Sequence, residues 1–146
     1  MHLFPNVEVL CYEKHNKKFK YPIVKLTDYE MITIGQETLI SIHTPGHYSD
    51  SVCYWNKKNN LIFTGDTIFV GRTGRVISNK SNIKDLYNSV YNKIFKLSQN
   101  TMIYPGHNYG FTKCITIKDN IKYSDFFSCN TLREFQYVMK KFESSR

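Results

Sequence analysis

The stretch Ile42-His43-Thr44-Pro45-Gly46-His47 ends the largely apolar run 38–43 and places a proline, a glycine and a histidine after it. The last three residues return later in the chain as Pro105-Gly106-His107, again directly after an apolar run. The 146 residues include four prolines, seven glycines and five histidines, so two copies of this tripeptide exceed what composition alone would produce. A third element of the same kind is Phe63-Thr64-Gly65-Asp66. It ends the apolar run that begins at Leu61 and places a glycine and an aspartate after it.

Each of these elements reads as a strand that stops at a glycine and is followed at once by a His or Asp side chain. Such a strand delivers that side chain to its carboxyl edge, where layered α/β folds commonly build sites. Neutral imidazole and carboxylate both suit borderline divalent metals, at ligand distances of ~2.0–2.2 Å. We therefore predict that His47, Asp66 and His107 bind one or two ions of zinc, or alternatively of iron or manganese. We assign no ligand role to the other histidines, which are His2, His15 and His43.

The first half of the chain reads as β-structure. Short runs of β-branched and aromatic residues, separated by turn-forming residues, predict strands over 7–11, 31–34, 38–43, 52–55 and 61–64. The last two runs are joined by the polar segment 56–60, which predicts a hairpin.

The second half changes to a helical period. From Asn82 to Leu97 apolar residues recur at three-to-four spacing, which predicts an amphipathic helix with Asn82 as its N-cap. A further strand is expected over 101–104, and Thr131-Leu132-Arg133-Glu134 has the pattern of a capping box that opens a last helix. We expect a single domain over 1–146, of the α/β or α+β layered class.

The composition limits which cellular compartment and which classes of binding partner are expected. The net charge of +8 favours an anionic partner, but the excess is mostly lysine spread along the chain, so we do not expect nucleic acid. Four scattered cysteines without a C-x-x-C pair predict free thiols in a reducing compartment. No apolar run approaches the ~20 residues of a membrane span, and the first residues lack the pattern of a secretory signal. We expect a cytoplasmic protein that does not span a membrane.

Several motifs together resemble the later motifs of the metallo-β-lactamase fold. They are Ile42–His47 with Ser49-Asp50-Ser51-Val52, Phe63–Gly71, Gly74-Arg75 and Tyr104–Tyr109. The branch that they resemble most is glyoxalase II, the hydroxyacylglutathione hydrolases, together with the related persulfide dioxygenases. The resemblance runs from about Leu39 to Tyr109, and the tail with Leu132, Glu134 and Phe135 is similar to the C-terminal helix of that branch.

The resemblance implies an αββα sandwich with a metal site at one edge of its two sheets. His47 resembles a ligand of the first metal, Asp66 the catalytic carboxylate that bridges both metals, and His107 a ligand of the second. Two such metals would turn a water into hydroxide at neutral pH, and this hydroxide would attack the carbonyl of a small-molecule thioester. Arg72 and Arg75 lie in the loop beside the site in this family, and their guanidinium groups would hold a carboxylate of a glutathione conjugate.

One family motif is absent from this sequence. Members carry H-x-H-x-D-H upstream of this region, and no such pattern occurs before His43. Three explanations are open, namely a fragment, ligands borrowed from a partner, and a degenerate scaffold. We favour an N-terminally incomplete fold whose site the chain cannot complete alone. Such a fold would leave a sheet edge or a core face uncovered and would invite dimerisation.

Three other functions remain open. A glutathione-persulfide dioxygenase would hold a single iron with His47 and Asp66 and would not use His107. A nuclease of the same fold is suggested by the charge of +8. A non-catalytic binding module is suggested by the missing ligands.

Overall fold

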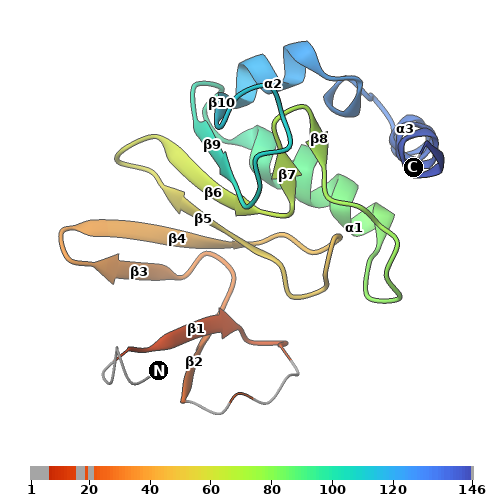
Figure 1. The fold of residues 1–146 in the computed structure, drawn as a ribbon. Coiled ribbons are helices and arrows are strands. Elements are labelled where there is room, and N and C mark those ends of the chain that lie inside the picture. Colours follow the sequence, from red (N-terminus) through yellow and green to blue (C-terminus); the bar gives the residue numbers. More distant parts are fainter. Residues whose placement is uncertain (1–6, 16–18, 20–21, 146) are drawn as a thin grey trace.

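A six-stranded mixed sheet forms the centre of the molecule (Figure 1). The computed structural model describes residues 7–15, 19 and 22–145. The sheet has the order β10-β9-β6-β5-β4-β3. Its strands are β3 (Met31–Ile34), β4 (Glu37–His43), β5 (Val52–Asn56), β6 (Leu61–Gly65), β9 (Met102–Pro105) and β10 (Ile115–Thr116). The hairpin predicted over 52–64 is β5 and β6, which pair antiparallel with Trp55 opposite Ile62.

The strand directions bring three loops to one edge of this sheet. β4 is antiparallel to β5, and β5 is antiparallel to β6, so β4 and β6 run in the same direction. β9 pairs with β6 in parallel. The carboxyl ends of β4, β6 and β9 therefore lie at the same edge, as the repeated glycine motif predicts.

Two smaller strand pairs flank the sheet. β1 (Val9–Tyr12) pairs in parallel with β2 (Ile23–Leu26), and β7 (Ile68–Phe69) pairs antiparallel with β8 (Arg72–Thr73). The first pair contacts the main sheet where the ring of Tyr12 stacks on His43, with 3.7 Å between the ring centroids. The second pair follows β6 directly, and Arg72, expected in a loop, is the first residue of β8.

The predicted helix over 82–97 is present, but its geometry changes along its length. α1 (Ile83–Tyr87) continues as a π-helical stretch over Asn88–Lys93 and ends in a 3-10 turn over Ile94–Lys96. The Asn82 side chain caps the start by accepting a hydrogen bond from the backbone N–H of Asp85 at 3.1 Å.

Two further helices follow the sheet. α2 (Ile117–Tyr123) is capped by Thr116. α3 (Leu132–Ser144) is capped by Thr131, whose side chain accepts from the N–H of Glu134 as the capping-box pattern predicts. A 3-10 turn over Asp125–Phe127 joins them. Within the described ranges, no helix is both long and apolar enough to cross a bilayer.

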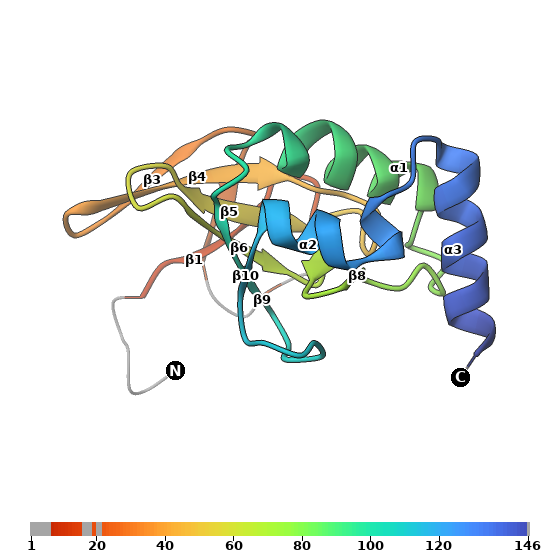
Figure 2. The same ribbon diagram turned by 90° about the horizontal axis from the view of Figure 1, so that it is seen from above.

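The core lies between one face of the sheet and the helices. Figure 2 shows the helix that begins at α1 lying along that face, with α3 beyond the end opposite β3. The sheet contributes Ile42, Cys53, Ile62 and Ile103 to one buried cluster. The helices contribute to the same cluster, among others, Leu86, Val90, Ile94, Phe135 and Met139. This packing anchors the three strands whose ends carry the candidate site.

Candidate metal centre

The structure brings the three predicted ligands together at the edge of the sheet. His47 follows β4, Asp66 follows β6 and His107 follows β9. The Nε2 atom of His47 lies 3.6 Å from Oδ2 of Asp66, and the Nε2 atom of His107 lies 3.5 Å from Oδ1 of the same carboxylate. Each oxygen of Asp66 therefore faces a different imidazole.

Hydrogen bonds between the three loops keep them in place. The hydroxyl oxygens of Thr44 and Thr67, both buried, lie 3.1 Å apart and join the loop after β4 to the loop after β6. The N–H of Gly106 donates to the carbonyl of Gly65 at 2.9 Å, which joins the ends of β9 and β6. The Ser89 hydroxyl donates to the carbonyl of Pro45 at 2.7 Å and holds the first loop against the long helix.

Glycines at the site allow the backbone to approach the predicted ligands closely. A Cβ at Gly74 would lie 2.0 Å from the carbonyl oxygen of Asp66 and 3.0 Å from Cγ of His47. A Cβ at Gly106 would lie 2.8 Å from Oδ1 of Asp66. A side chain at either position would displace Asp66, so these loops need glycine because space is lacking.

The surroundings of His47 determine which nitrogen faces Asp66. Its Nδ1 lies 2.8 Å from the backbone carbonyl oxygen of Arg75, and a carbonyl can only accept, so Nδ1 carries the hydrogen. In the neutral ring Nε2 then presents an unshared electron pair to Asp66, and the 3.6 Å gap joins two acceptors. Ligands of one tetrahedral ion, each at ~2.0–2.2 Å, lie about 3.4 Å apart, so a cation fits between these two atoms.

The described residues form two pairs and not a full coordination sphere. His47 and Asp66 make one pair and His107 and Asp66 the other, because the carboxylate is shared. Across the described part of the chain, no three His, Cys, Asp or Glu side chains gather closely enough to hold a single ion. A catalytic zinc usually has three protein ligands, so each half of this centre would need at least one more.

A cavity of about 200 Å³ adjoins this edge, and both predicted arginines line it. The guanidinium of Arg72 lies over the ring of Tyr109 at 4.4 Å and over the rings of Phe142 and Phe69 at 5.1 and 5.4 Å. These aromatic faces hold the guanidinium plane by cation-π attraction. Two of these stacking partners, Tyr109 and Phe142, have no signal in the local sequence, since they lie far along the chain from Arg72.

The histidines without a predicted ligand role have other contacts. The Nε2–H of His43 donates to the carbonyl of Ser49 at 2.9 Å, while its ring stacks on Tyr12. His15 pairs with Asp50 through Nδ1. His2 lies outside the described residues.

All four cysteines are free thiols, as the sequence predicts. Cys53 is fully buried in the core, and this burial raises the pKa of its thiol to about 11. A neutral thiol of this kind serves packing and not metal binding.

Residues 2–107 match the family model of the Metallo-beta-lactamase superfamily. The chain is 35% identical over 107 residues to a hydroxyacylglutathione hydrolase of Francisella tularensis subsp. novicida, an alignment that covers 73% of this chain and 41% of that protein. It is 36% identical over 100 residues to a hydroxyacylglutathione hydrolase of Dictyostelium discoideum, covering 64% and 37%. The chain thus spans well under half the length of these relatives.

The fold agrees with solved structures of related proteins. The crystal structure of ETHE1 from Myxococcus xanthus aligns with a TM-score of 0.81 at 25% identity, over 92% of this chain and 57% of that one. A metallo-beta-lactamase from Staphylococcus aureus aligns with a TM-score of 0.79 at 24% identity, over 89% and 43%. The α/β class and the metallo-β-lactamase fold expected from the motifs are thereby confirmed, with only part of each solved chain matched. Since the family model matches most of its residues, the chain belongs to the metallo-beta-lactamase superfamily.

Proposed function

We propose that this chain supplies part of the metal centre of a glyoxalase II type hydrolase, which hydrolyses a glutathione thioester or a related thioester. The observation that carries the proposal is the single carboxylate of Asp66 with one oxygen toward each of two imidazoles. A carboxylate in this position suits a bridge between two ions. The hydroxyacylglutathione hydrolases among its relatives support the choice of substrate class.

The residues of the chain have distinct roles in this proposal. His47 and Asp66 would hold one ion, and Asp66 and His107 the other. Zinc, iron or manganese in these positions would lower the pKa of a water toward neutrality and polarise the thioester carbonyl. The carbonyl of Arg75 keeps Nδ1 of His47 protonated, so Nε2 stays available on the side of Asp66. The remaining ligands would come from a further polypeptide segment.

The cavity beside the centre would receive the substrate. Arg72 and Arg75 both line it, and Arg72 is oriented by three aromatic rings. Guanidinium groups bind carboxylates with paired, charge-assisted hydrogen bonds, which suits the carboxylates of a glutathione conjugate. The net charge of +8 would also attract such an anionic substrate.

Metal titration of the chain extended by the N-terminal segment of the Francisella relative tests the proposal, because the present chain supplies only two side-chain ligands for each ion. We expect zinc to bind, Asp66→Ala to abolish binding, and His107→Ala to lower the stoichiometry from two ions to one. His43→Ala is the matched control, because His43 donates to a backbone carbonyl and does not face Asp66. Less than about 0.1 equivalents after loading with zinc or iron would refute the metal centre and leave the non-catalytic binding module.

The variant His107→Ala also distinguishes the hydrolase from the dioxygenase. The comparison uses a chain extended by the N-terminal segment of the Francisella relative, so that the missing ligands are present. If the protein is a hydrolase, His107→Ala loses one of its two ions and its thioesterase activity on a glutathione thioester. If the wild type holds a single iron and His107→Ala leaves that iron content unchanged, the dioxygenase is favoured instead.

A further inference from the structure

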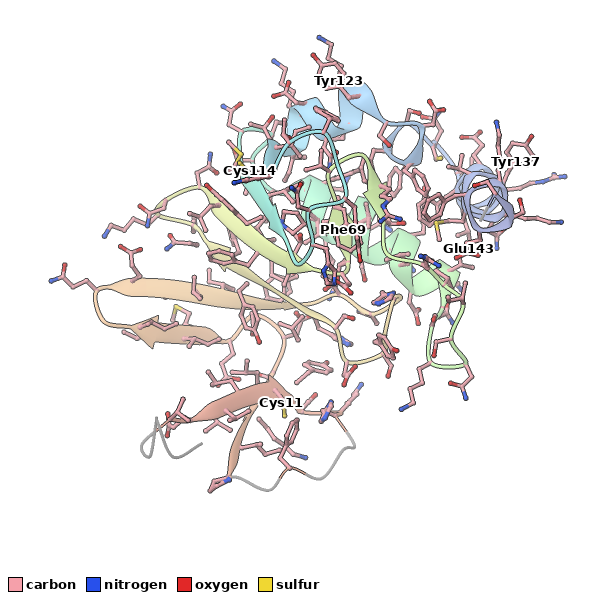
Figure 3. All side chains as sticks on the ribbon, viewed as in Figure 1. Cys11, Phe69, Cys114, Tyr123, Tyr137 and Glu143 are labelled. Atoms are coloured by element: carbon pink, nitrogen blue, oxygen red, sulfur yellow. The ribbon has the colours of Figure 1, made fainter. Side chains whose placement is uncertain are left out.

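One peptide group connects the C-terminal helix to His47. The N–H of Val76 donates to Oε1 of Glu143 at 2.7 Å, and Glu143 lies near the end of α3. The carbonyl of Arg75 accepts from Nδ1–H of His47 at 2.8 Å. This carbonyl and this N–H belong to the same planar unit, the Arg75–Val76 peptide. Figure 3 shows Glu143 on the side of α3 that faces this loop.

A carboxylate that accepts from the N–H of a peptide group changes how strongly the carbonyl oxygen of that group accepts a hydrogen bond. The negative charge attracts the N–H and polarises the amide, so the carbonyl oxygen becomes a stronger acceptor. The two hydrogen bonds also fix the plane of the peptide, because rotation of the peptide would break both of them. Glu143 thus has a direct physical route to the imidazole of His47, although the two side chains do not touch.

The imidazole has little freedom on its other sides. Gly74 packs against its Cβ and Cγ so closely that a methyl group would lie about 3 Å from them. The ring of Tyr48 meets its ring edge-on, with 4.9 Å between the centroids. Asp66 is 3.6 Å from Nε2, beyond hydrogen-bond distance, so the direct hydrogen bond that sets the tautomer and the tilt of the ring is the one to the Arg75 carbonyl.

We propose that Glu143 is a positioning residue for His47. It acts through the Arg75–Val76 peptide and keeps the imidazole in the Nδ1–H form, with Nε2 directed at Asp66. Histidines that bind metals commonly donate their second N–H to a carboxylate or carbonyl, which fixes the ring and raises its basicity. Here a carbonyl is the direct partner, and the carboxylate supports it through the backbone. The metal-related part of this inference rests on the proposed function, whereas the tautomer does not.

Nitrogen-15 NMR of the histidine rings in the metal-free protein tests the inference without any metal. The His47 signals are assigned by their loss in His47→Gln. In the wild type we expect one protonated Nδ1 and an unprotonated Nε2. Glu143→Leu should give a mixture of both tautomers, and Glu143→Gln, which keeps an oxygen acceptor, should restore the Nδ1–H form. An unchanged His47 spectrum in folded Glu143→Leu would overturn the proposal.

Glu134 provides a matched control on the same helix. Its Oε2 accepts from the backbone N–H of Asn130 at 2.7 Å, so it has the same chemistry at the same distance but lies away from His47. Glu134→Leu should leave the His47 tautomer unchanged. If Glu143→Leu does not fold, Glu143→Gln decides the question alone. Loss of the charge should then speed exchange of the Nδ1 hydrogen with water several-fold, and an unchanged exchange rate would contradict the proposal.

Zinc affinity is the second readout. We expect Glu143→Leu to weaken zinc binding about 10- to 100-fold, the range found for partners that orient a ligand, while Glu134→Leu leaves it unchanged. If the wild-type chain extended by the N-terminal segment of the Francisella relative binds no zinc, while Glu143→Leu shows the expected tautomer change, the metal centre is refuted and the positioning role is retained. Normal zinc binding, together with a His47 tautomer that does not change in Glu143→Leu, would support the metal centre and refute the positioning role of Glu143.

Discussion

The two faces of the central sheet differ sharply, although they come from the same strands. Ile62 and Ile103 are fully buried under the helices, whereas their neighbours Phe63 and Tyr104 are 44% and 40% exposed on the other face. The rings of Phe63 and Tyr104 lie 5.8 Å apart and form an aromatic pair. Strands that are apolar on both faces are typical of sheets covered on both sides. The sequence of β6 and β9 therefore suits two layers, of which the described residues provide one.

Truncating one side chain on each face of the sheet should give the largest difference in unfolding free energy between two variants. Ile62→Ala removes fully buried methyl groups from the core and should cost about 2–5 kcal/mol of unfolding free energy. Phe63→Ala removes a larger but half-exposed ring and should cost clearly less. Urea denaturation of the two variants measures both values. Equal losses would show that the aromatic face is covered in solution, as dimerisation through this face would do.

A methyl group at Gly74 tests how tightly the loops pack at the edge of the sheet, where the candidate metal centre lies. Gly74→Ala places a Cβ against the carbonyl of Asp66 and should cost about 1–3 kcal/mol through overcrowding. Because the shift moves Asp66 and His47, zinc binding should weaken as well. Gly35→Ala is the control, since Gly35 lies in open space at φ +61° in the turn between β3 and β4. It should lose about 1–2 kcal/mol of stability and keep its zinc affinity.

Cys53 on the covered face should produce the smallest effect, and only in alkali. Its pKa rises from the model-peptide range near 9 to about 11 on folding, because burial opposes the thiolate. A raised pKa means that the stabilising contribution is complete below pH 9 and declines as the pH rises toward 11. By linkage this group alone should cost about 1 kcal/mol at pH 10. Urea denaturation of the wild type and Cys53→Ala at pH 8 and 10 measures it, and an equal alkaline loss in both would contradict the assignment.

The parts of the fold with local signals could be predicted from the sequence. The polar segment before Leu61 predicts the β5–β6 hairpin, and the strand-Gly-His or strand-Gly-Asp pattern predicts which residues meet at the edge. The capping residues Asn82 and Thr131 locate two helix starts. These features are readable because each depends on residues close together in the chain.

Other elements have a weaker local signal or none. β7 and β8 have two residues each, too few for alternation to appear. α2 is not among the predicted helices; its cap, Thr116 followed three positions later by Asp119, is similar to the capping box of α3 but has Asp in place of Glu. The π-helical stretch after α1 keeps the apolar spacing of an ordinary helix. The contact of Glu143 with Val76 joins residues brought together by tertiary packing, which no local pattern encodes.

Anomalous X-ray scattering from zinc-soaked crystals tests the metal centre most directly. We predict one zinc peak between Nε2 of His47 and Oδ2 of Asp66, and a second between Oδ1 of Asp66 and Nε2 of His107. Asp66→Asn crystals soaked in the same way should lose both peaks. Zinc bound elsewhere in the wild-type protein, with neither pair occupied, would contradict the assignment of these three side chains as ligands.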